Sequence, residues 1–344
     1  MWQLIGQSRV ISLLKQGVET GTLAHAYLFI GPSHVGKMTL ALQMAQALNC
    51  ESTDRPCQEC TSCQKINAMN HADVQVVGLA QNDDAAEAKL ISIDQMKELQ
   101  HSANLPPFEG NRKVYIIDGA ELMSTDAANC LLKTLEEPPE SVTIILLTEN
   151  DRLLPTTVVS RCQRLELPPL SKDDISRALI ESSSIEPQKA KLLAGLSHGC
   201  PGWAISAVRD ESLVQHLENE LDRIIDIIDA NCETRFAYVA PMAARFSQDR
   251  NSVYDLLDLW LDYWHDLMLV KLGCHDMITY IDRVKELTES AEGYRIDQIN
   301  DYIRSIRAAV DQLRQNANPR LTLEVLMLDI PRKERGSPTD GLPS

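Results

Sequence analysis

The sequence predicts an α/β protein, with a doubly wound parallel sheet in the amino-terminal half and an all-helical part after it. Up to residue 168, short apolar runs typical of buried strands alternate with stretches of helical periodicity, which is the pattern of a parallel sheet. A glycine-rich stretch, Gly31–Lys37, follows the first apolar run and opens a helix, as a phosphate-binding loop does. Beyond Pro169 the strand signals stop, so we expect the sheet to end there.

The expected strands and helices alternate in order along this half. The strands are Ala26–Ile30, Val74–Leu79, Val114–Ile117, Val142–Leu147 and Arg164–Leu167. Helical periodicity covers Thr39–Leu48 and Ile93–Ser102 between them. Ser124 and Thr125 are candidate caps for a third helix. That helix stops at Pro138, because the residue before a proline disfavours helical conformation.

Helical periodicity continues through the rest of the chain. Ser171–Glu181 and Pro187–Leu196 are expected to be short helices that end at the turn cluster His198–Gly202. Farther along, broad apolar faces recur at helical spacing and include Trp260 and Trp264. We expect this stripe of Trp and Leu to form the core of a helix bundle rather than a ligand site.

The chain is acidic: 33 Lys and Arg against 49 Asp and Glu among 344 residues give a formal net charge of −16. This charge opposes bulk attraction to a nucleic-acid backbone, so any work on DNA should go through partners or a local basic strip. An acidic surface also simply keeps a protein in solution. The chain shows no apolar stretch as long as a membrane span, and its start lacks a basic region followed by an apolar core. A cytoplasmic location without a membrane partner is therefore expected, and the tail 331–344, rich in Pro, Gly and charge, should be disordered.

Four of the nine cysteines, Cys50, Cys57, Cys60 and Cys63, have the spacing C-x6-C-x2-C-x2-C. The short x2 steps let two thiolates reach one ion, and four thiolates suit tetrahedral zinc. Disulfides are disfavoured in a reducing compartment. An iron–sulfur cluster can use similar spacings, but nothing in the sequence indicates electron transfer. The sequence therefore predicts a structural Zn²⁺ site in an insertion at about residues 50–63.

We expect no metal-binding role for His71 or for the other five cysteines. His71 is near enough in sequence to replace a cysteine, but with four thiolates present it is expected to be a surface histidine. The other five cysteines are isolated and are expected to be small packing residues: Cys130, Cys162, Cys200, Cys232 and Cys274.

The glycine-rich stretch matches the phosphate-loop pattern at Gly31, Gly36 and Lys37. In that pattern backbone amides cradle phosphate groups, the lysine neutralises them, and a hydroxyl that follows binds Mg²⁺. Met38 stands where the hydroxyl residue belongs, and a thioether does not ligate a hard cation. Thr39 lies one residue too late. Two interpretations stay open: binding of ATP or ADP without an Mg²⁺ ligand from this loop, or a turn that is structural only.

Longer motifs resemble the AAA+ clamp-loader family, whose bacterial members belong to DNA polymerase III. The most specific are Asn129–Pro139, which reads Asn-Cys-Leu-Leu-Lys-Thr-Leu-Glu-Glu-Pro-Pro, and the later Ser160-Arg161-Cys162. The resemblance runs from residue 4 to about residue 330. It also rests on Leu4–Gln7, His25–Pro32, the four cysteines, Leu147–Asn150 and Asn318–Glu324.

The resemblance implies an AAA+ core with the zinc insertion over residues 1–168, a small helical lid over 169–203 and a helical collar over 204–330. Through their collars, five subunits of this family form a hetero-pentameric ring that includes motor and delta subunits. The ring opens a sliding clamp and places it on primer–template DNA. The clamp and the DNA would be partners through the complex, and the chain would be part of the DNA-directed DNA polymerase III holoenzyme, a nucleotidyltransferase, without being catalytic alone.

The resemblance also implies roles for single residues. The family contacts adenine at the positions of Ile5, Gly6 and Gln7, and Thr148 occupies its first sensor position. Arg161 matches the arginine finger that one subunit supplies in trans to its neighbour. Such an arginine stabilises the negative charge that develops on the γ-phosphate, so Arg161 is the residue expected to act in catalysis.

The chain departs from the active members of the family at three places. Asp118 ends an expected strand, where P-loop enzymes hold Mg²⁺, but the glutamate that AAA+ ATPases place directly after it is replaced by Gly119. Glu121 lies two positions farther on. Met38 replaces the hydroxyl residue, and Gly199–Trp203 lacks the sensor arginine that active subunits carry in the lid. These departures favour a non-hydrolysing ring member.

Three alternatives stay open at this point. In the first, the chain is an active ATPase, the motor subunit of the same loader. In the second, it is a P-loop kinase of small molecules with a zinc module. In the third, it is a scaffold that never binds nucleotide.

Overall fold

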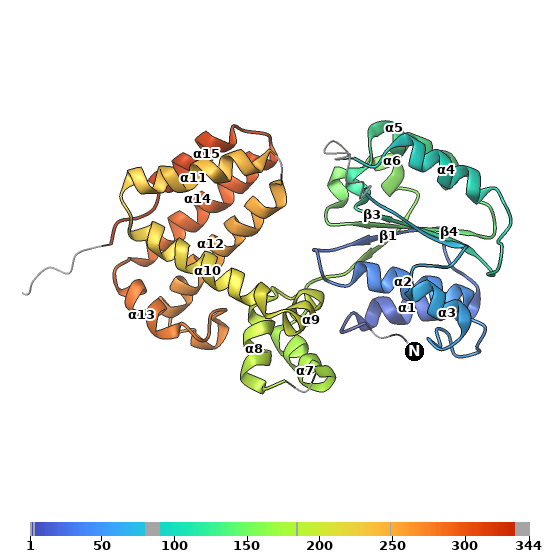
Figure 1. Cartoon of the computed structure of the whole chain (residues 1–344), viewed down its shortest axis with the longest axis horizontal. Helices are drawn as coiled ribbons and strands as arrows, with labels where there is room; N and C mark the ends of the chain where they lie inside the picture. The colour runs from blue at the N-terminus through green and yellow to red at the C-terminus, as the bar shows by residue number, and fades with distance from the viewer. Residues whose placement is uncertain (1, 3, 80–89, 184, 248, 334–344) are drawn as a thin grey trace, which may run out of the picture. The chain divides into compact units, whose positions relative to one another are not determined.

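The computed structural model of the chain describes residues 2, 4–79, 90–183, 185–247 and 249–333. It divides into two compact units (Figure 1). The first unit holds Met1–Ala190 with Ser197–Ile205, and the second holds Lys191–Leu196 with Ser206–Ser344. The expected disordered tail lies outside the described residues from residue 334 onward.

The first unit is built on a five-stranded sheet in the order β2-β3-β4-β1-β5. Every pairing in it is parallel, which confirms the predicted parallel sheet. The strands are β1 (Ala26–Ile30), β2 (Val74–Val77), β3 (Lys113–Asp118), β4 (Val142–Thr148) and β5 (Gln163–Glu166). All seven residues of the central β4 are buried, as expected for a strand that is covered on both faces.

Helices cover both faces of the sheet (Figure 1). They are α1 (Ser8–Thr20), α2 (Lys37–Asn49), α3 (Thr61–Asn67), α4 (Ile93–Ala103), α5 (Thr125–Glu136) and α6 (Thr156–Val159). Alternate residues of β4 point to opposite faces: Ile144 packs with α4 and α5, and Ile145 packs with α1 and α2. Ser124 caps α5 as predicted, since its hydroxyl accepts the N–H of Ala127 at 3.2 Å.

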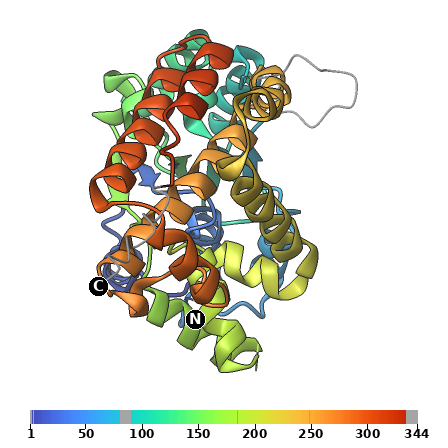
Figure 2. The same cartoon turned by 90° about the vertical axis from the view of Figure 1, so that its left-hand side faces the viewer.

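After β5 the described chain is helical. The segment expected as a lid contains α7 (Lys172–Ser183), α8 (Pro187–Leu196) and the start of α9 (Pro201–Arg209). The segment expected as a collar contains α10 (Glu211–Asp229), α11 (Cys232–Phe246), α12 (Arg250–Lys271), α13 (Val284–Glu292), α14 (Ile296–Arg314) and α15 (Pro319–Leu328) (Figures 1 and 2).

The core of the second unit is aromatic. Trp260 and Trp264 of α12 are fully buried, and the ring of Trp264 lies 4.6 Å from that of Tyr302 on α14. Such tilted ring pairs stabilise a core beyond the area that they bury. The Trp and Leu stripe is therefore bundle core, as predicted. In the described part of the chain, no helix has the length and apolar character needed to cross a membrane.

Candidate functional site

The phosphate loop joins β1 to α2 and requires two of its glycines. A Cβ on Gly31 would lie 2.4 Å from the carbonyl oxygen of Leu167, so no side chain fits there. Gly36, the residue before α2, has a φ of +106°, a conformation that residues with a side chain rarely adopt. The strand–loop–helix arrangement expected from Gly31, Gly36 and Lys37 is therefore present.

Lys37 is folded back onto its own loop. Its Nζ donates to the carbonyl oxygens of Gly31 at 2.6 Å and Pro32 at 2.9 Å. Burial lowers the pKa of Lys37, and the carboxylates of Glu149, Glu121 and Asp118 partly oppose this. The loop cation thus lies in a region that already holds three negative charges.

Met38 and Thr39 are the first residues after the loop lysine, at the start of α2. Met38 is half-buried and packs against the core on the α1–α2 face of the sheet. Thr39 is exposed on the first turn of α2. That this loop gives Mg²⁺ no ligand stays a prediction from the loop sequence.

The carboxyl ends of β3 and β4 bring acidic side chains to the loop, because the ends of parallel strands share one edge of a sheet. Asp118 ends β3 and is exposed, and Gly119 follows it with a φ of +69°. Glu121 Oε1 accepts the N–H of Glu149 at 3.3 Å. Its Oε2 is buried and has no hydrogen-bond partner among the described residues.

Glu149 is a residue of this site that the sequence analysis does not single out. It directly follows β4, and its carboxylate accepts a hydrogen bond from the hydroxyl of Ser33 in the phosphate loop. The preceding Thr148 is buried; its carbonyl accepts the N–H of Gly31 at 3.1 Å, and its Oγ1 accepts the N–H of Asn150 at 3.2 Å. Two features of the sequence could have indicated it: its position one step beyond a central strand, and its place within the motif Leu147–Asn150.

The segment expected as a lid meets the phosphate loop through a glycine. The N–H of Gly202 donates to the carbonyl of His34 at 2.9 Å, and a Cβ on Gly202 would lie 2.7 Å from that oxygen. Nearby, burial raises the pKa of the Cys200 thiol while the charge of Lys37 lowers it. Cys200 is buried, as expected for a packing residue.

The segment expected to contact adenine runs beside the start of the lid. Gly6 has a φ of +65°, and a Cβ there would lie 2.5 Å from Leu170 Cδ2. Gln7 Nε2 donates to the carbonyl of Pro168 at 2.6 Å, and Ile5 is half-buried. The structure thus brings Ile5, Gly6 and Gln7 to the edge of the sheet that holds the loop.

The four cysteines expected to bind zinc come together. The Sγ atoms of Cys50, Cys57, Cys60 and Cys63 all lie within 4.8 Å of one another, and all four thiols are free. Tetrahedral zinc with bonds of about 2.3 Å sets its sulfur atoms about 3.8 Å apart, and the Cys50–Cys60 pair stands at 4.0 Å. The cluster is compatible with structural zinc.

The backbone around the cluster is arranged for thiolates. The N–H groups of Ser52 and Cys57 point to Cys50 Sγ at 3.4 Å each, and that of Cys60 points to Cys57 Sγ at 3.3 Å. Hydrogen bonds from the N–H groups of Cys60 and Glu59 lower the pKa of Cys57 to about 6. Burial raises the pKa of Cys50. A cation at the centre would favour the charged form of all four thiols.

Two expectations about neighbouring residues are wrong. His71 is buried rather than exposed: its Nε2 is 3.1 Å from Ser62 Oγ, and its Nδ1 accepts the N–H of Asp73 at 3.1 Å. Both ring nitrogens are therefore occupied. Cys232 and Cys274 are exposed and are not packing residues, whereas Cys130 and Cys162 are half-buried and contact the core on the α4–α5 face.

Arg161 lies just before β5 and is partly exposed. Its Nη2 donates to Glu136 Oε1 at 2.7 Å, and its Nη1 donates to the carbonyl of Thr157 at 2.8 Å. A guanidinium has five N–H groups, so three of them have no partner in the part of the chain that the structure describes. The side chain is 35% exposed, which leaves these groups open to a ligand from outside.

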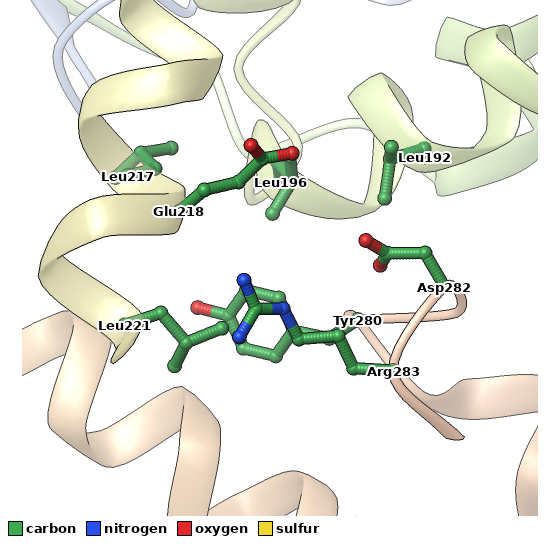
Figure 3. A pocket seen from close by; sticks show the side chains of 8 residues that line it. All are labelled: Leu192, Leu196, Leu217, Glu218, Leu221, Tyr280, Asp282 and Arg283. Atoms are coloured by element: carbon green, nitrogen blue, oxygen red, sulfur yellow. The ribbon is translucent and has the colours of Figure 1, made fainter. Parts of the chain in front are cut away.

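Two hollows elsewhere do not form ligand sites. A pocket of the helical unit, of about 10 Å³, has room for no more than one water molecule (Figure 3). It is lined by Leu192, Leu196, Leu217, Glu218, Leu221, Tyr280, Asp282 and Arg283. A groove of about 300 Å³ lies beside β2, and its lining is mostly apolar, with the already occupied His71.

Known proteins resemble this chain along most of its length. A family model described as DNA polymerase III, delta subunit, matches residues 6–171. DNA polymerase III subunit delta' of Bacillus subtilis is 29% identical over 323 residues, which cover 94% of this chain and 95% of that protein. DNA polymerase III subunit tau of Escherichia coli is 30% identical and covers 83% of this chain, which spans only 47% of tau. Among solved structures, the RuvB branch-migration motor of Thermotoga maritima matches with a TM-score of 0.42 at 20% identity, covering 66% of this chain and 65% of that one.

Proposed function

Since this chain belongs to the family of DNA polymerase III clamp-loader subunits, we propose that it acts as the delta-prime subunit of the loader. In this role it joins motor and delta subunits in a cytoplasmic hetero-pentameric ring that opens the sliding clamp and places it on primer–template DNA. It does not hydrolyse ATP itself, and it supplies Arg161 to the ATP of a neighbouring motor subunit. The match to 95% of a delta' protein, against 47% of tau, supports the choice of subunit.

The contrast between two cations carries this proposal. Lys37, the cation of the chain's own phosphate loop, is turned inward onto the carbonyls of Gly31 and Pro32. Arg161 is partly exposed; among the described residues only Glu136 and Thr157 accept from its guanidinium, so three of its five N–H groups remain for a ligand. This arrangement favours a chain whose Arg161 acts on the nucleotide of a neighbouring subunit over a chain whose Lys37 acts on a nucleotide in its own phosphate loop.

The missing catalytic groups support the absence of hydrolysis. Met38 offers no oxygen to Mg²⁺, and Gly119 offers no carboxylate to a water molecule. Without these groups, neither the metal nor the attacking water is positioned at the γ-phosphate. ATP or ADP could then bind without being turned over.

One observation favours the rival assignment, an active motor subunit. Glu121 keeps a buried oxygen without a hydrogen-bond partner among the described residues, and its charge acts on Lys37. A carboxylate at this place resembles a group that activates water. Nothing in the site favours the small-molecule kinase, and the similarity to clamp-loader subunits argues against it.

We assign Zn²⁺ to the four cysteines as a structural ion. Four thiolates fill a tetrahedral shell and leave no open position, so the ion would hold the insertion together rather than take part in chemistry. The ion supplies a folding centre for a segment too short to build its own apolar core.

Arg161→Ala in a reconstituted loader tests the proposal. The variant should fold and join the ring, while DNA- and clamp-stimulated ATP hydrolysis by the adjacent motor subunit slows by at least about tenfold. Arg161→Lys should not restore the rate, because an ammonium group cannot reproduce the planar fork of a guanidinium. The measurement is the steady-state rate of phosphate release together with the rate of clamp loading.

Arg177→Ala is the matched control. Arg177 also pairs with a carboxylate at the surface, Asp174, but lies in α7, away from the Ser-Arg-Cys motif. An unchanged rate for Arg161→Ala, in a ring of normal composition, would show that the finger role is wrong.

A further inference from the structure

The phosphate loop of this chain already holds an anionic group. A loop of this kind attracts phosphate through a lysine and the backbone N–H groups at the start of a helix. Here the hydroxyl of Ser33 donates to the carboxylate of Glu149, and the charge of Glu149 also acts on Lys37. The Glu149 carboxylate therefore bonds one polar side chain of the loop directly and acts through its charge on the lysine that would otherwise meet a phosphate.

The backbone fixes where Glu149 stands. The preceding residue, Thr148, accepts the N–H of Gly31 at 3.1 Å, which ties the end of β4 to the base of the loop. The N–H of Glu149 donates to Glu121 Oε1 at 3.3 Å. These two hydrogen bonds fix the backbone at Glu149, so the choice of side-chain rotamer alone decides whether its carboxylate reaches Ser33.

Two further groups of the loop also have partners within the chain. Lys37 Nζ donates to two loop carbonyls at 2.6 and 2.9 Å. The carbonyl of His34 accepts the N–H of Gly202 at 2.9 Å. A nucleotide therefore has to displace the contacts of Ser33 and Lys37, and it brings negative charge to a place where Glu149 and Glu121 already stand.

We propose that Glu149 is a gate for the nucleotide site: its carboxylate stands in for a phosphate on the loop and sets how weakly the chain binds ATP or ADP. The proposal concerns the loop named above and does not depend on the role of Arg161. It makes nucleotide affinity a property controlled by one side chain at the end of β4. Alanine there would remove both the competitor for Ser33 and the repulsion of the incoming phosphates, whereas glutamine would remove the repulsion and leave only a neutral amide oxygen as acceptor for Ser33.

The test is binding of ADP to the full-length chain, measured by titration calorimetry in EDTA so that Mg²⁺ plays no part. Glu149→Gln should bind ADP at least about tenfold more tightly than the unmodified chain, and Glu149→Ala should bind with a similar gain. Adding Lys37→Ala to Glu149→Gln should abolish the gain, because the nucleotide then loses the cation of the loop.

Glu166→Gln is the matched control. It removes one negative charge from the same edge of the sheet, at the end of β5, from a side chain that is 74% exposed and lies 3.8 Å from Arg164. It should leave the affinity for ADP unchanged. The gate is refuted if folded Glu149→Gln and Glu149→Ala proteins bind ADP no more tightly than Glu166→Gln, or if none of them binds.

Hydrolysis provides a separate readout. With Mg²⁺ and ATP, the Glu149→Gln protein should bind nucleotide without turnover, since Met38 and Gly119 are unchanged. Turnover combined with tighter binding would support the gate and contradict the assignment to a non-hydrolysing subunit. The two ideas can therefore fail independently.

Discussion

Two buried polar side chains, Asp73 and Asn49, hold the segment that leads into β3. Asp73 accepts the N–H groups of Phe108, Glu109 and Gly110 at 2.7 to 2.8 Å. Asn49 Oδ1 accepts the next two N–H groups along the chain at 2.8 and 2.9 Å. Five consecutive backbone donors are thus satisfied by two side chains, which fixes a segment that has no regular secondary structure.

Asp73→Asn should destabilise the protein by about 1–3 kcal/mol at pH 7, because the new amide directs N–H donors at backbone N–H groups. Burial alone would raise the pKa of Asp73, but its three N–H donors and the nearby His71 outweigh burial and hold the pKa below the usual value. A carboxyl group with a lowered pKa stabilises the fold above the pKa of the unfolded chain. That contribution is lost as the pH falls through the folded pKa.

Urea unfolding of the two proteins across pH measures this effect. The difference in unfolding free energy should be largest near neutral pH and should shrink as the pH falls below about 4. Asp94→Asn, at a side chain that is 80% exposed, is the control and should change little. A difference that stayed constant from pH 7 to pH 3 would contradict the role given to the charge of Asp73.

Residues that belong to a local motif could be predicted from the sequence, and residues that act through the fold could not. The loop glycines and the four cysteines are recognisable because their chemistry fixes their spacing. Glu149 and Asp73 have no such spacing. Glu149 meets Ser33 across 116 positions of sequence, and Asp73 meets residues 35 to 37 positions away. Only the assembled sheet brings them together.

At the scale of elements, periodicity predicted the sheet and the bundle, because both depend on which residues face the core. α1 and α3 are absent from the predicted elements. α3 has only seven residues, and its place is set by Cys60 at its start and Cys63 within it rather than by an apolar stripe. Within α12, the fully buried Asp266 accepts the N–H groups of Thr279 and Tyr280 at 2.9 to 3.0 Å, an interaction that an apolar pattern cannot show.

The zinc insertion is expected to behave as a separate folding element. The purified chain should contain one Zn²⁺, and Cys60→Ser should lose most of it, because a three-cysteine site leaves the ion with an open position. Cys60 is also the residue directly before α3, at its N-cap position, so proteolysis should reach residues 50–67 while the sheet remains folded. Metal analysis and limited proteolysis followed by mass spectrometry measure the two effects.

Cys232→Ser is the control for this change, since Cys232 is exposed and far from the cluster in sequence. It should leave metal content and proteolysis unchanged. A chain purified without zinc, or with the absorption band of an iron–sulfur cluster, would show that the assignment of the ion is wrong.

At the scale of the whole molecule, the chain has two cationic sites suited to a phosphate group, the phosphate loop and Arg161. They differ in whether the hydrogen-bond donors already have partners within the protein. The edge of the sheet that bears the phosphate loop is closed by the protein's own groups: Lys37 on loop carbonyls, Ser33 on Glu149, and His34 on Gly202. The turn before β5 presents Arg161, three of whose N–H donors have no acceptor within the part of the chain that the structure describes. This contrast supports the proposal that the chain contributes to catalysis through Arg161, at a nucleotide that another subunit brings.

The isolated full-length chain should therefore show no ATP turnover above the background of a Lys37→Ala variant, with Mg²⁺ present and at any nucleotide concentration that saturates binding. Catalysis of phosphoryl transfer consists largely of positioning the metal ion, the water and the charge of the phosphate. In this chain Met38 removes a metal ligand, Gly119 removes the carboxylate at the usual place, and Glu121 is engaged with the backbone of Glu149. Phosphate release by the motor subunit of the same loader, measured under the same conditions, is the positive control. Turnover at the rate of that subunit, lost in Lys37→Ala and in Glu121→Gln, would mean that Glu121 replaces the missing glutamate and that this chain is itself a motor.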